Sequence, residues 1–599
     1  MKKKTKIYKA TETITDNSHE DFCCHVVRQS RNNTSVFQEF AALHGGKKTC
    51  EVRKMFSLLG IILLFAGLLL LVAACGNGGV QDNGESGEGE QRIVRITQAR
   101  VPNIDPAIDT DLSSSIAYVN LYDALVSISL GNEAVPQLAK SWEYTDDGME
   151  WTFYLRDDVI FHDGTPLTAS DFVFSLNRLL AIGQGYSYLV APYIENAEAL
   201  GEHTVRLSLN AAFAPILTVL CRVYVLNEQL IMANLADGDY GAYGDYGTGF
   251  LLTNSAGSGA YKVKELRLMD RLVMEQNQGY WRNWDARAPQ VAEIIGSTEP
   301  ATIRTLMSNY QLEITDNFQS PETLSFLSTL EGAEVATMPS GVGGFLMLNQ
   351  TRAPLDDVHV RRALAYMLDR VTIGESIFVG SQPMRSCVPS PVAGFTDQVE
   401  QYEYDLGKAA EELEKSKYYG QFDQYPITIQ SPGEVPAMQL ISLMLQATAN
   451  QLGLTLNVEE IPWISFIENV ASPETTAHIS ISMVTLDYPE AGSMLFNRFH
   501  SSMNGTWMQA EWMSDSILDA MIEDALLELD TGRRFAKYRD IQVYVQDQCY
   551  SINAFEEWPR FAYRSSSVSF PAADSAAKGG SVSVVMGYNH IFHEFRVLE

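Results

Sequence analysis

The chain has 599 residues, of which 46% are hydrophobic, and it carries 74 Asp and Glu against 43 Lys and Arg. This surplus of negative charge argues against binding to nucleic acid, because such binding depends on basic patches. The length exceeds what a single hydrophobic core supports, so two or three globular parts are expected.

The N-terminal region contains a candidate secretory signal. Residues 1–51 are basic and polar and show no sustained hydrophobic period, whereas the run from Met55 to Ala74 is apolar and uncharged. Basic residues, then an apolar stretch, then small residues before a cleavage point are typical of a signal peptide. We therefore predict a signal peptide at 52–74, with translation starting near Val52 and residues 1–51 either upstream over-translation or disordered.

The signal ends in Val72-Ala-Ala-Cys75, which resembles the lipobox of bacterial lipoproteins. The resemblance implies cleavage before Cys75 and acylation of its thiol, which would anchor the protein on the extracytoplasmic face of the cell membrane. Two acyl chains hold a protein on a bilayer far better than one. A transmembrane helix is the alternative, because an apolar run of this length also spans a bilayer. Residues 75–91, rich in Gly and acidic side chains, predict a flexible tether.

Alternating apolar residues predict strands in the first part of the folded body. These strands are expected at 92–98, 150–156, 204–209, 260–265 and 271–276. The segment Thr168-Ala-Ser-Asp171 is a capping box, and it predicts a helix with Phe172, Leu176 and Leu179 on one stripe. Residues 237–259 are rich in Gly and Tyr and predict a long loop.

A second body is expected to begin near Gly343. Its other predicted elements are strands at 345–350 and 478–486, and helices at 358–369, 515–529 and 533–547. Residues 426–431, 436–452 and 454–461 predict a strand, a helix and a strand, a spacing that favours a parallel crossover. The fold class is therefore α/β. Residues 561–599 predict strands and irregular chain.

Several segments together resemble the family 5 solute-binding proteins of ABC importers, the dipeptide and oligopeptide binders. In chain order they are Asn103-Ile-Asp-Pro106, Asn120-Leu-Tyr-Asp-Ala-Leu125, Val135-Pro-Gln-Leu-Ala-Lys-Ser-Trp142, Asp147-Gly-Met-Glu-Trp-Thr-Phe-Tyr-Leu-Arg156, Phe161-His-Asp-Gly164, Gly257-Ser-Gly-Ala-Tyr261, Asn277-Gln-Gly-Tyr-Trp281, Val360-Arg-Arg-Ala-Leu-Ala-Tyr366 and Asp487-Tyr-Pro-Glu490. The resemblance implies a periplasmic-binding-protein-like fold with two hinged lobes and a subdomain inserted in lobe I. Lobe I would hold 92–341 and, by a C-terminal return, 559–599; the inserted subdomain would hold about 130–235 and lobe II 342–558.

The same resemblance implies a receptor rather than an enzyme. The protein would capture short peptides in the cleft between the lobes and deliver them to the permease subunits of an ABC transporter. It would act without a cofactor and as a monomer. The sequence contains no Gly-x-x-x-x-Gly-Lys-Ser/Thr motif, so ATP hydrolysis would belong to a partner. The alternatives are the same fold binding a nickel chelate or an oligosaccharide, a surface signalling or chaperone lipoprotein, and a secreted hydrolase.

Asp487 is the leading candidate for the ligand site. It follows a predicted strand, where open α/β sheets place their ligands, and in peptide-binding relatives the Asp of this motif pairs with the α-ammonium of the peptide. An aspartate that caps a turn is the alternative. Family members often carry Asp-Pro shortly after this position, whereas here Pro489 precedes Glu490. This departure leaves the shape of the first side-chain pocket open.

Other residues are expected around Asp487. Met483, Val484 and Thr485 would offer main-chain groups to an extended ligand, unless they only form a buried strand. Three side chains are further candidates for the cleft: Tyr488, Trp463 and Asn349. Core packing is the alternative for Trp463.

Some residues invite a chemical role and are expected to be structural. His162-Asp163-Gly164 would form a turn, and Arg361 and Arg362 would make solvated salt bridges on a helix. Cys221, Cys387 and Cys549 allow at most one disulfide, so a disulfide framework is excluded. The sequence has no Cys-x-x-Cys or His-x-x-x-His spacing and therefore gives no support to a zinc site.

Overall fold

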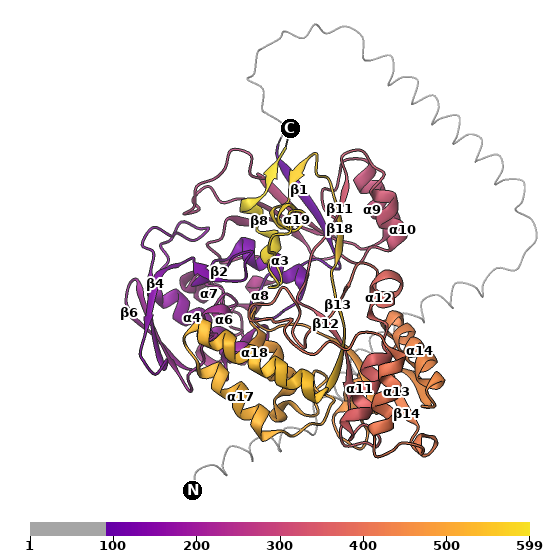
Figure 1. The fold of residues 1–599 in the computed structure, drawn as a ribbon. Helices are drawn as coiled ribbons and strands as arrows, with labels where there is room; N and C mark the ends of the chain where they lie inside the picture. The colour runs from indigo at the N-terminus through magenta and orange to yellow at the C-terminus, as the bar shows by residue number, and fades with distance from the viewer. Residues whose placement is uncertain (1–90, 599) are drawn as a thin grey trace, which may run out of the picture. The chain divides into compact units, whose positions relative to one another are not determined.

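A computed structural model describes residues 91–598, and its helices and strands form two lobes built on separate sheets (Figure 1). Lobe I is the part built on a four-stranded sheet, whose strands follow the order β1 (Ile93–Gln98), β10 (Val291–Gly296), β9 (Arg271–Gln276) and β8 (Tyr261–Arg267). Strand β1 is parallel to β10, and the other pairs are antiparallel. The helices of this lobe are α3 (Leu112–Leu121), α9 (Pro300–Ser308), α10 (Pro321–Leu327) and α19 (Pro571–Ala577).

A subdomain is inserted between β1 and β8. It contains an antiparallel sheet in the order β4 (Ala139–Tyr144), β5 (Glu150–Leu155), β7 (Thr204–Leu209) and β6 (Ile194–Gly201). The small hairpin β2 (Val126–Ile128) and β3 (Ala134–Pro136) precedes it. Its helices are α4 (Ala169–Ile182), α5 (Ser187–Val190), α6 (Ile216–Leu220), α7 (Glu228–Ala233) and α8 (Thr248–Leu251). The predicted capping box of Thr168 and Asp171 is present at the start of α4.

Lobe II is the part built on a six-stranded mixed sheet. Its strand order is β13 (Gln382–Pro383), β17 (Ser551–Glu556), β12 (Gly343–Leu348), β16 (Ile479–Val484), β14 (Ile427–Pro432) and β15 (Leu456–Ile461). Strand β14 is parallel to β15 and is joined to it through α14 (Pro436–Gln451), so the predicted parallel crossover is confirmed. The other helices are α11 (Val358–Met367), α12 (Arg370–Thr372), α13 (Leu406–Lys415), α15 (Trp463–Val470), α16 (Ala491–Phe499), α17 (Ser516–Leu527) and α18 (Thr531–Gln548). The α/β fold class is confirmed.

The chain passes between the two lobes in two neighbouring segments. Strand β11 (Glu334–Thr337) pairs with β18 (Arg560–Tyr563) on the lobe I side, and β12 pairs with β17 on the lobe II side. Between these pairs, the Met338 amide donates to the Pro559 carbonyl (3.1 Å), and the Glu557 amide donates to the Val342 carbonyl (2.9 Å). Two short crossings side by side are the arrangement that a hinge requires.

The C-terminal segment after β18 packs on lobe I. The Phe592 amide donates to Asn120 Oδ1 on α3 (2.8 Å), and Tyr588 donates its hydroxyl to the Cys221 carbonyl (2.9 Å). The predicted strands occur there as β18, β19 (Val568–Ser569) and β20 (Arg596–Val597). The prediction missed α19, which begins at Pro571, a residue whose fixed φ suits the first turn of a helix.

Four of the sequence segments quoted above converge on one buried carboxylate in lobe I. Asp123 Oδ1 accepts from Gln137 Nε2 (2.7 Å) and from the Tyr280 hydroxyl (3.3 Å), and its Oδ2 accepts from Ser258 Oγ (2.8 Å). Burial raises the pKa of Asp123 to about 6. A Cβ on Gly257, beside Ser258, would lie 1.9 Å from the Leu121 carbonyl oxygen, so only glycine fits this approach. These motif residues therefore build lobe I.

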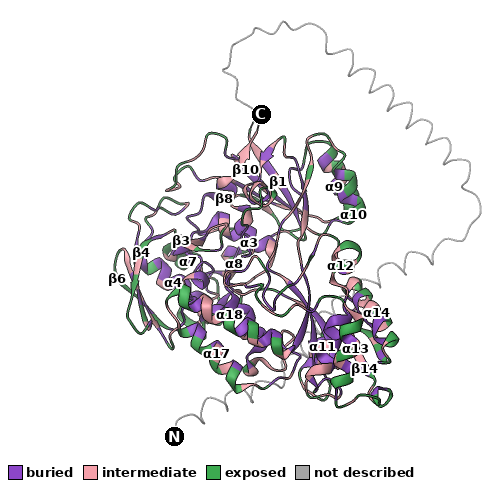
Figure 2. Ribbon diagram, in the orientation of Figure 1, coloured by how far each residue is buried: buried purple, intermediate pink, exposed green. Residues whose placement is uncertain are grey.

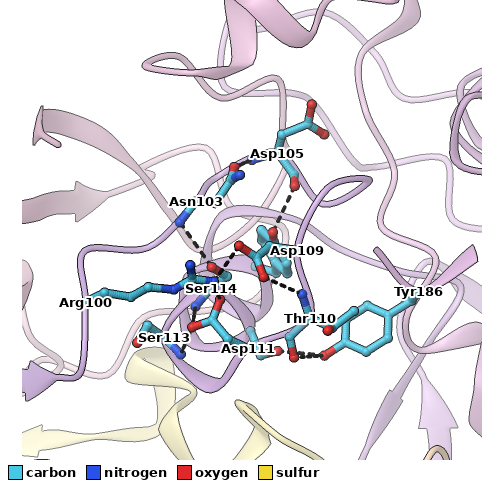
Figure 3. Close-up of polar contacts among 11 residues, drawn as sticks. Arg100, Asn103, Asp105, Asp109, Thr110, Asp111, Ser113, Ser114 and Tyr186 are labelled. Atoms are coloured by element: carbon cyan, nitrogen blue, oxygen red, sulfur yellow. Dashed lines mark hydrogen bonds and ion pairs between the residues drawn. The ribbon is translucent and has the colours of Figure 1, made fainter. Parts of the chain in front are cut away.

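Ion pairs and a helix cap fix the conformation of the loop that follows β1 (Figure 3). Arg100 Nη2 lies 2.5 Å from Asp109 Oδ2 and 2.6 Å from Asp111 Oδ2. Asp111 also caps α3, accepting from the amide of Ser113 at 2.9 Å. An aspartate before a helix satisfies amides that have no partner within the helix. The loop is closed further by Tyr186, which donates its hydroxyl to the Thr110 carbonyl (3.1 Å).

Buried residues concentrate on the sheets and on the inward faces of the helices (Figure 2). In lobe II, apolar side chains of β12, β14 and β16 pack against α11 and α14 to form one continuous core. Within residues 91–598, no helix combines the length and the apolar character needed to cross a membrane.

Three expectations about individual segments need correction or completion. Arg361 is buried and bonds to main-chain carbonyls instead of making a solvated salt bridge; its Nε donates to the Cys549 carbonyl (3.0 Å), just past the end of α18. Helix ends leave carbonyls without partners, and Arg361 satisfies them. The stretch 237–259, predicted as a long loop, contains α8 and a short 3-10 turn at Gly241–Tyr243. The three cysteines in the described part of the chain, at positions 221, 387 and 549, are buried and free.

Candidate functional site

The loop between β16 and α16 carries Asp487. Strand β16 ends at Val484, and α16 begins at Ala491, with Glu490 in the N-cap position. The Asp487 amide donates to Ser493 Oγ in the first turn of that helix (2.9 Å). This bond fixes the main chain of Asp487 just beyond the carboxyl end of a sheet strand, where open α/β sheets form their ligand sites.

The carboxylate of Asp487 has neutral partners. Its Oδ2 accepts from Asn497 Nδ2 on α16 (2.7 Å), and its Oδ1 accepts from the Tyr188 hydroxyl on α5 of the inserted subdomain (3.3 Å). Within residues 91–598, Asp487 makes no ion pair with a Lys, Arg or His. Burial raises the pKa of Asp487 above its ordinary value. The site therefore holds a desolvated acidic group that a cation would stabilise.

Asp487 lines a pocket of about 210 Å³ between the inserted subdomain and lobe II. The subdomain contributes Tyr188, Leu189, Pro192, Tyr193 and Phe213, and lobe II contributes Asp487, Tyr488, Ser493, Phe496, Asn497, Met503 and Met508. Aromatic rings connect the two sides. Tyr193 stacks on Phe213 with 3.7 Å between ring centroids, and Phe213 meets Tyr488 edge to face at 5.7 Å. The pocket thus combines one acidic group with apolar and aromatic walls.

The main chain before Asp487 has a free edge. Strand β16 pairs with β12 along its whole length, but β14 pairs with β16 only at Ile479 and Ser480. In the described part of the chain, no strand covers that side of residues 481–484. An extended ligand that paired there would add a further strand. The geometry suits the expected role of Met483 and Val484.

The remaining predicted site residues fall into two groups. Tyr488 lines the pocket, whereas Thr485 is exposed between β16 and Asp487. Asn349 is fully buried, and its Nδ2 donates to the carbonyls of Pro473 and Thr476 (both 3.3 Å), so the structure does not bring it to this pocket. Trp463 stacks on Phe466 with 5.4 Å between ring centroids, and it is also absent from the lining of the Asp487 pocket. Cys75 lies outside the described residues.

Sequence reasoning missed the residues that complete the site. Ser493 and Asn497 lie four positions apart on α16, so they share a helix face beside Asp487, and this spacing is a signal that the sequence contained. Tyr188 and Phe213 gave no such signal. They reach the pocket from a subdomain about 300 positions away, and only the packing of the two lobes brings them there.

Glu490 is not a second free acid. Arg534 Nε and Nη2 donate to its two carboxylate oxygens, each at 2.9 Å, and the Tyr538 hydroxyl adds a bond at 3.3 Å. Burial alone would lower the pKa of Arg534, but the pairing with Glu490 raises it. The pKa of Arg534 therefore lies above its ordinary value. The altered Pro489-Glu490 segment therefore presents a neutral ion pair, while Asp487 keeps its uncompensated charge.

His162 belongs to a turn, as expected. The Gly164 amide donates to the Phe161 carbonyl (2.9 Å), and Gly164 has a φ of 90°, a conformation that favours glycine. His162 Nε2 lies 3.1 Å from the Gly259 carbonyl oxygen. Among residues 91–598, no group of three His, Cys, Asp or Glu side chains is arranged to hold a metal ion.

Comparisons with known proteins place the chain among solute receptors. The model of the bacterial extracellular solute-binding proteins, family 5 (middle part), matches residues 133–506. The probable D,D-dipeptide-binding periplasmic protein DdpA of Escherichia coli is 28% identical over 464 residues, which cover 76% of this chain and 86% of that protein.

Two solved structures show the same fold. The ABC transporter substrate-binding protein CtaP of Listeria monocytogenes has a TM-score of 0.71 and 19% identity, and the match covers 85% of this chain and all of that one (100%). The periplasmic binding protein DppA of Helicobacter pylori, solved in complex with the peptide STSA, has a TM-score of 0.64 and 21% identity, with 85% and 98% covered.

Proposed function

The chain belongs to the bacterial extracellular solute-binding proteins of family 5, and we propose that it captures short peptides with a free N-terminus and delivers them to an ABC permease. The observation that carries this proposal is Asp487, a desolvated carboxylate at an interlobe pocket with only neutral partners. A peptide ammonium supplies the missing positive charge and up to three hydrogen bonds. The free edge of residues 481–484 supports pairing with a peptide main chain.

The volume and the walls of the pocket support a short ligand. Its 210 Å³ is smaller than the roughly 300–1,000 Å³ of ordinary small-molecule sites. Main-chain pairing and a fixed ammonium depend little on side-chain identity, so they suit a receptor for mixed peptides. An oligosaccharide or an anionic metal chelate fits less well, because it would leave the Asp487 carboxylate without a counter-charge.

The proposal is tested by binding measurements on protein freed of bound ligand. Native mass spectrometry of the protein as purified should show masses of short peptides, and calorimetry after partial unfolding and refolding should show binding of unmodified di- to pentapeptides. Failure of every unmodified peptide to bind a correctly refolded sample, together with an empty purified protein, would contradict the proposed function.

We also propose that the mature protein is anchored through acyl chains on Cys75, because Val72-Ala-Ala-Cys75 has the small residues and the thiol that such processing needs. Acylated protein should appear in the membrane fraction, and Cys75→Ser should move most of it to the soluble fraction. Mass spectrometry of the mature N-terminus checks the modification. An unmodified thiol at Cys75 in membrane-bound protein would contradict the anchor.

Peptide affinity should fall as the pH is lowered through the pKa of Asp487. A bound ammonium stabilises the carboxylate, so binding lowers this pKa, and the ligand must compete with a proton wherever the free protein is protonated. The affinity reaches its full value at a pH well above the pKa of Asp487 in the ligand-free protein. Below that pKa the affinity decreases by up to about tenfold per pH unit. Because burial raises that pKa, the loss begins at a higher pH than for an exposed aspartate. Calorimetry from pH 7 to 4.5, where the peptide ammonium stays charged, checks this, and Asp487→Asn should bind weakly with little pH dependence.

A further inference from the structure

A second and larger pocket lies beside the Asp487 pocket. It has a volume of about 490 Å³ and is lined from both sides of the interlobe boundary. Phe213 and Tyr488 line the first pocket, whereas Ala214, next to Phe213, and Glu490, two positions after Tyr488, line the second. The edge-to-face contact of Phe213 with Tyr488 therefore stands at the boundary between the two pockets.

The walls of the second pocket carry several large aromatic and aliphatic side chains among polar ones. The inserted subdomain contributes Trp142, Tyr144 and Trp151, and lobe II contributes Leu529 and Phe535. Trp151 is buried, and the ring of Tyr144 lies 4.5 Å from it. A large apolar side chain would gain contact area on both sides of such a pocket.

The ion pair in the wall does not add a free charge. Arg534 gives its Nε and Nη2 to Glu490, and its Nη1 donates to the Glu528 carbonyl (2.9 Å). The carboxylate of Glu490 is already satisfied by these bonds and by Tyr538. The remaining charged residue of the lining is Glu133, which is exposed to water at the rim. The interior of the pocket is therefore neutral, and its rim disfavours an acidic group.

The spacing along the chain places this pocket within reach of the same ligand. Asp487 and Glu490 are three positions apart, so their Cα atoms are separated by at most about 11 Å. An extended peptide advances by about 3.3 Å per residue. A ligand whose ammonium lies at Asp487 can direct the side chain of one of its first three residues into the second pocket, provided that the Phe213–Tyr488 contact gives way.

We propose that this second pocket is a specificity subsite that takes a bulky uncharged side chain, aromatic or large aliphatic, from one of the first three residues of the peptide. The proposal rests on the proposed function, because the ammonium at Asp487 sets the register. Trp142, on β4, is the specificity-determining residue that forms the subdomain wall. The subsite makes the receptor selective for peptides with such a residue near the N-terminus.

Calorimetry with tripeptides tests the subsite. Ala-Ala-Ala is compared with three peptides that carry Phe at the first, second or third position. At one position Phe should bind about tenfold tighter than Ala or better, because the ring is removed from water. At that position Lys should bind less tightly than Phe, and Glu should bind most weakly. Trp142→Ala should remove most of the preference for Phe while leaving the affinity for Ala-Ala-Ala within about twofold.

Two further variants keep the test decisive. Ala134→Phe places a ring in the pocket, and it should weaken the Phe peptide at least fivefold with little effect on Ala-Ala-Ala. Trp463→Ala is the matched control, because this tryptophan lies outside the lining, and it should leave the preference unchanged. The proposal is overturned if tripeptides bind without a preference for Phe at any position, or if both folded pocket variants keep the preference. If no tripeptide binds at all, the proposed function is wrong, and the proposed subsite is then rejected as well.

Discussion

Asp487→Ala is expected to weaken the binding of an unmodified short peptide by about 2–5 kcal/mol, or roughly 30-fold to several thousand-fold. In the native protein a bound ammonium would meet a carboxylate that already has two neutral donors, Asn497 and Tyr188. After the substitution the ammonium is still removed from water but finds no negative charge. Calorimetry measures the loss, and Asp397→Asn is the control, because Asp397 is an exposed acid of the same lobe. That control should change the affinity by less than about 1 kcal/mol.

Acetylating the peptide turns this comparison into a double-mutant cycle. An N-acetyl peptide has no ammonium, so it should lose a similar binding energy on the native protein and little more on the Asp487→Ala variant. A coupling of 2 kcal/mol or more between the two changes would place the ammonium at the carboxylate, since such cycles isolate the pairwise contribution. Equal sensitivity to acetylation in both proteins would show that the N-terminus binds elsewhere.

Local sequence patterns were sufficient to predict many elements of the fold. The alternation at 150–156 gave β5, the capping box at Thr168 gave α4, and the strand–helix–strand spacing after 426 gave a parallel pair. These features depend on residues close together in the chain. Asp487 could be named as a candidate because the loop after a strand and its sequence motif are also local.

The rest of the site depends on contacts between distant segments. Tyr188 meets Asp487 across 299 positions, and Arg361 meets the carbonyls beyond α18 across about 190. Neither contact leaves a periodic signal, because the two partners meet only when distant parts of the chain fold together. Asn349 shows the converse, since a polar residue entering a lobe suggested a ligand contact, yet its carboxamide is used by the main chain of a neighbouring loop. Distinguishing such roles requires the tertiary structure.

Arg178→Met is expected to lower the free energy of unfolding by about 3–5 kcal/mol. Arg178 on α4 and Asp105 in the loop after β1 are both almost completely buried, and two N–H groups of the guanidinium donate to the two carboxylate oxygens at 2.7 and 2.6 Å. Arg178 Nε also donates to the Tyr246 carbonyl at 2.7 Å, so a single side chain joins three segments. Methionine keeps much of the volume but leaves the Asp105 carboxylate in the core without its cation.

A surface pair provides the matched control for this prediction. Arg206 Nη2 lies 2.5 Å from Glu198 Oε2, but the Arg206 side chain is 38% exposed. Arg206→Met should therefore lower the free energy of unfolding by less than about 1 kcal/mol. Chemical unfolding at neutral pH, followed by circular dichroism, measures both variants. The double variant Arg178→Met with Asp105→Leu should recover part of the loss, because no unpaired charge then remains buried. If Arg178→Met and Arg206→Met lowered the free energy of unfolding equally, the buried pair would not stabilise the packing of α4 on the loop that follows β1. The stability of lobe I would then have to come from its apolar core alone.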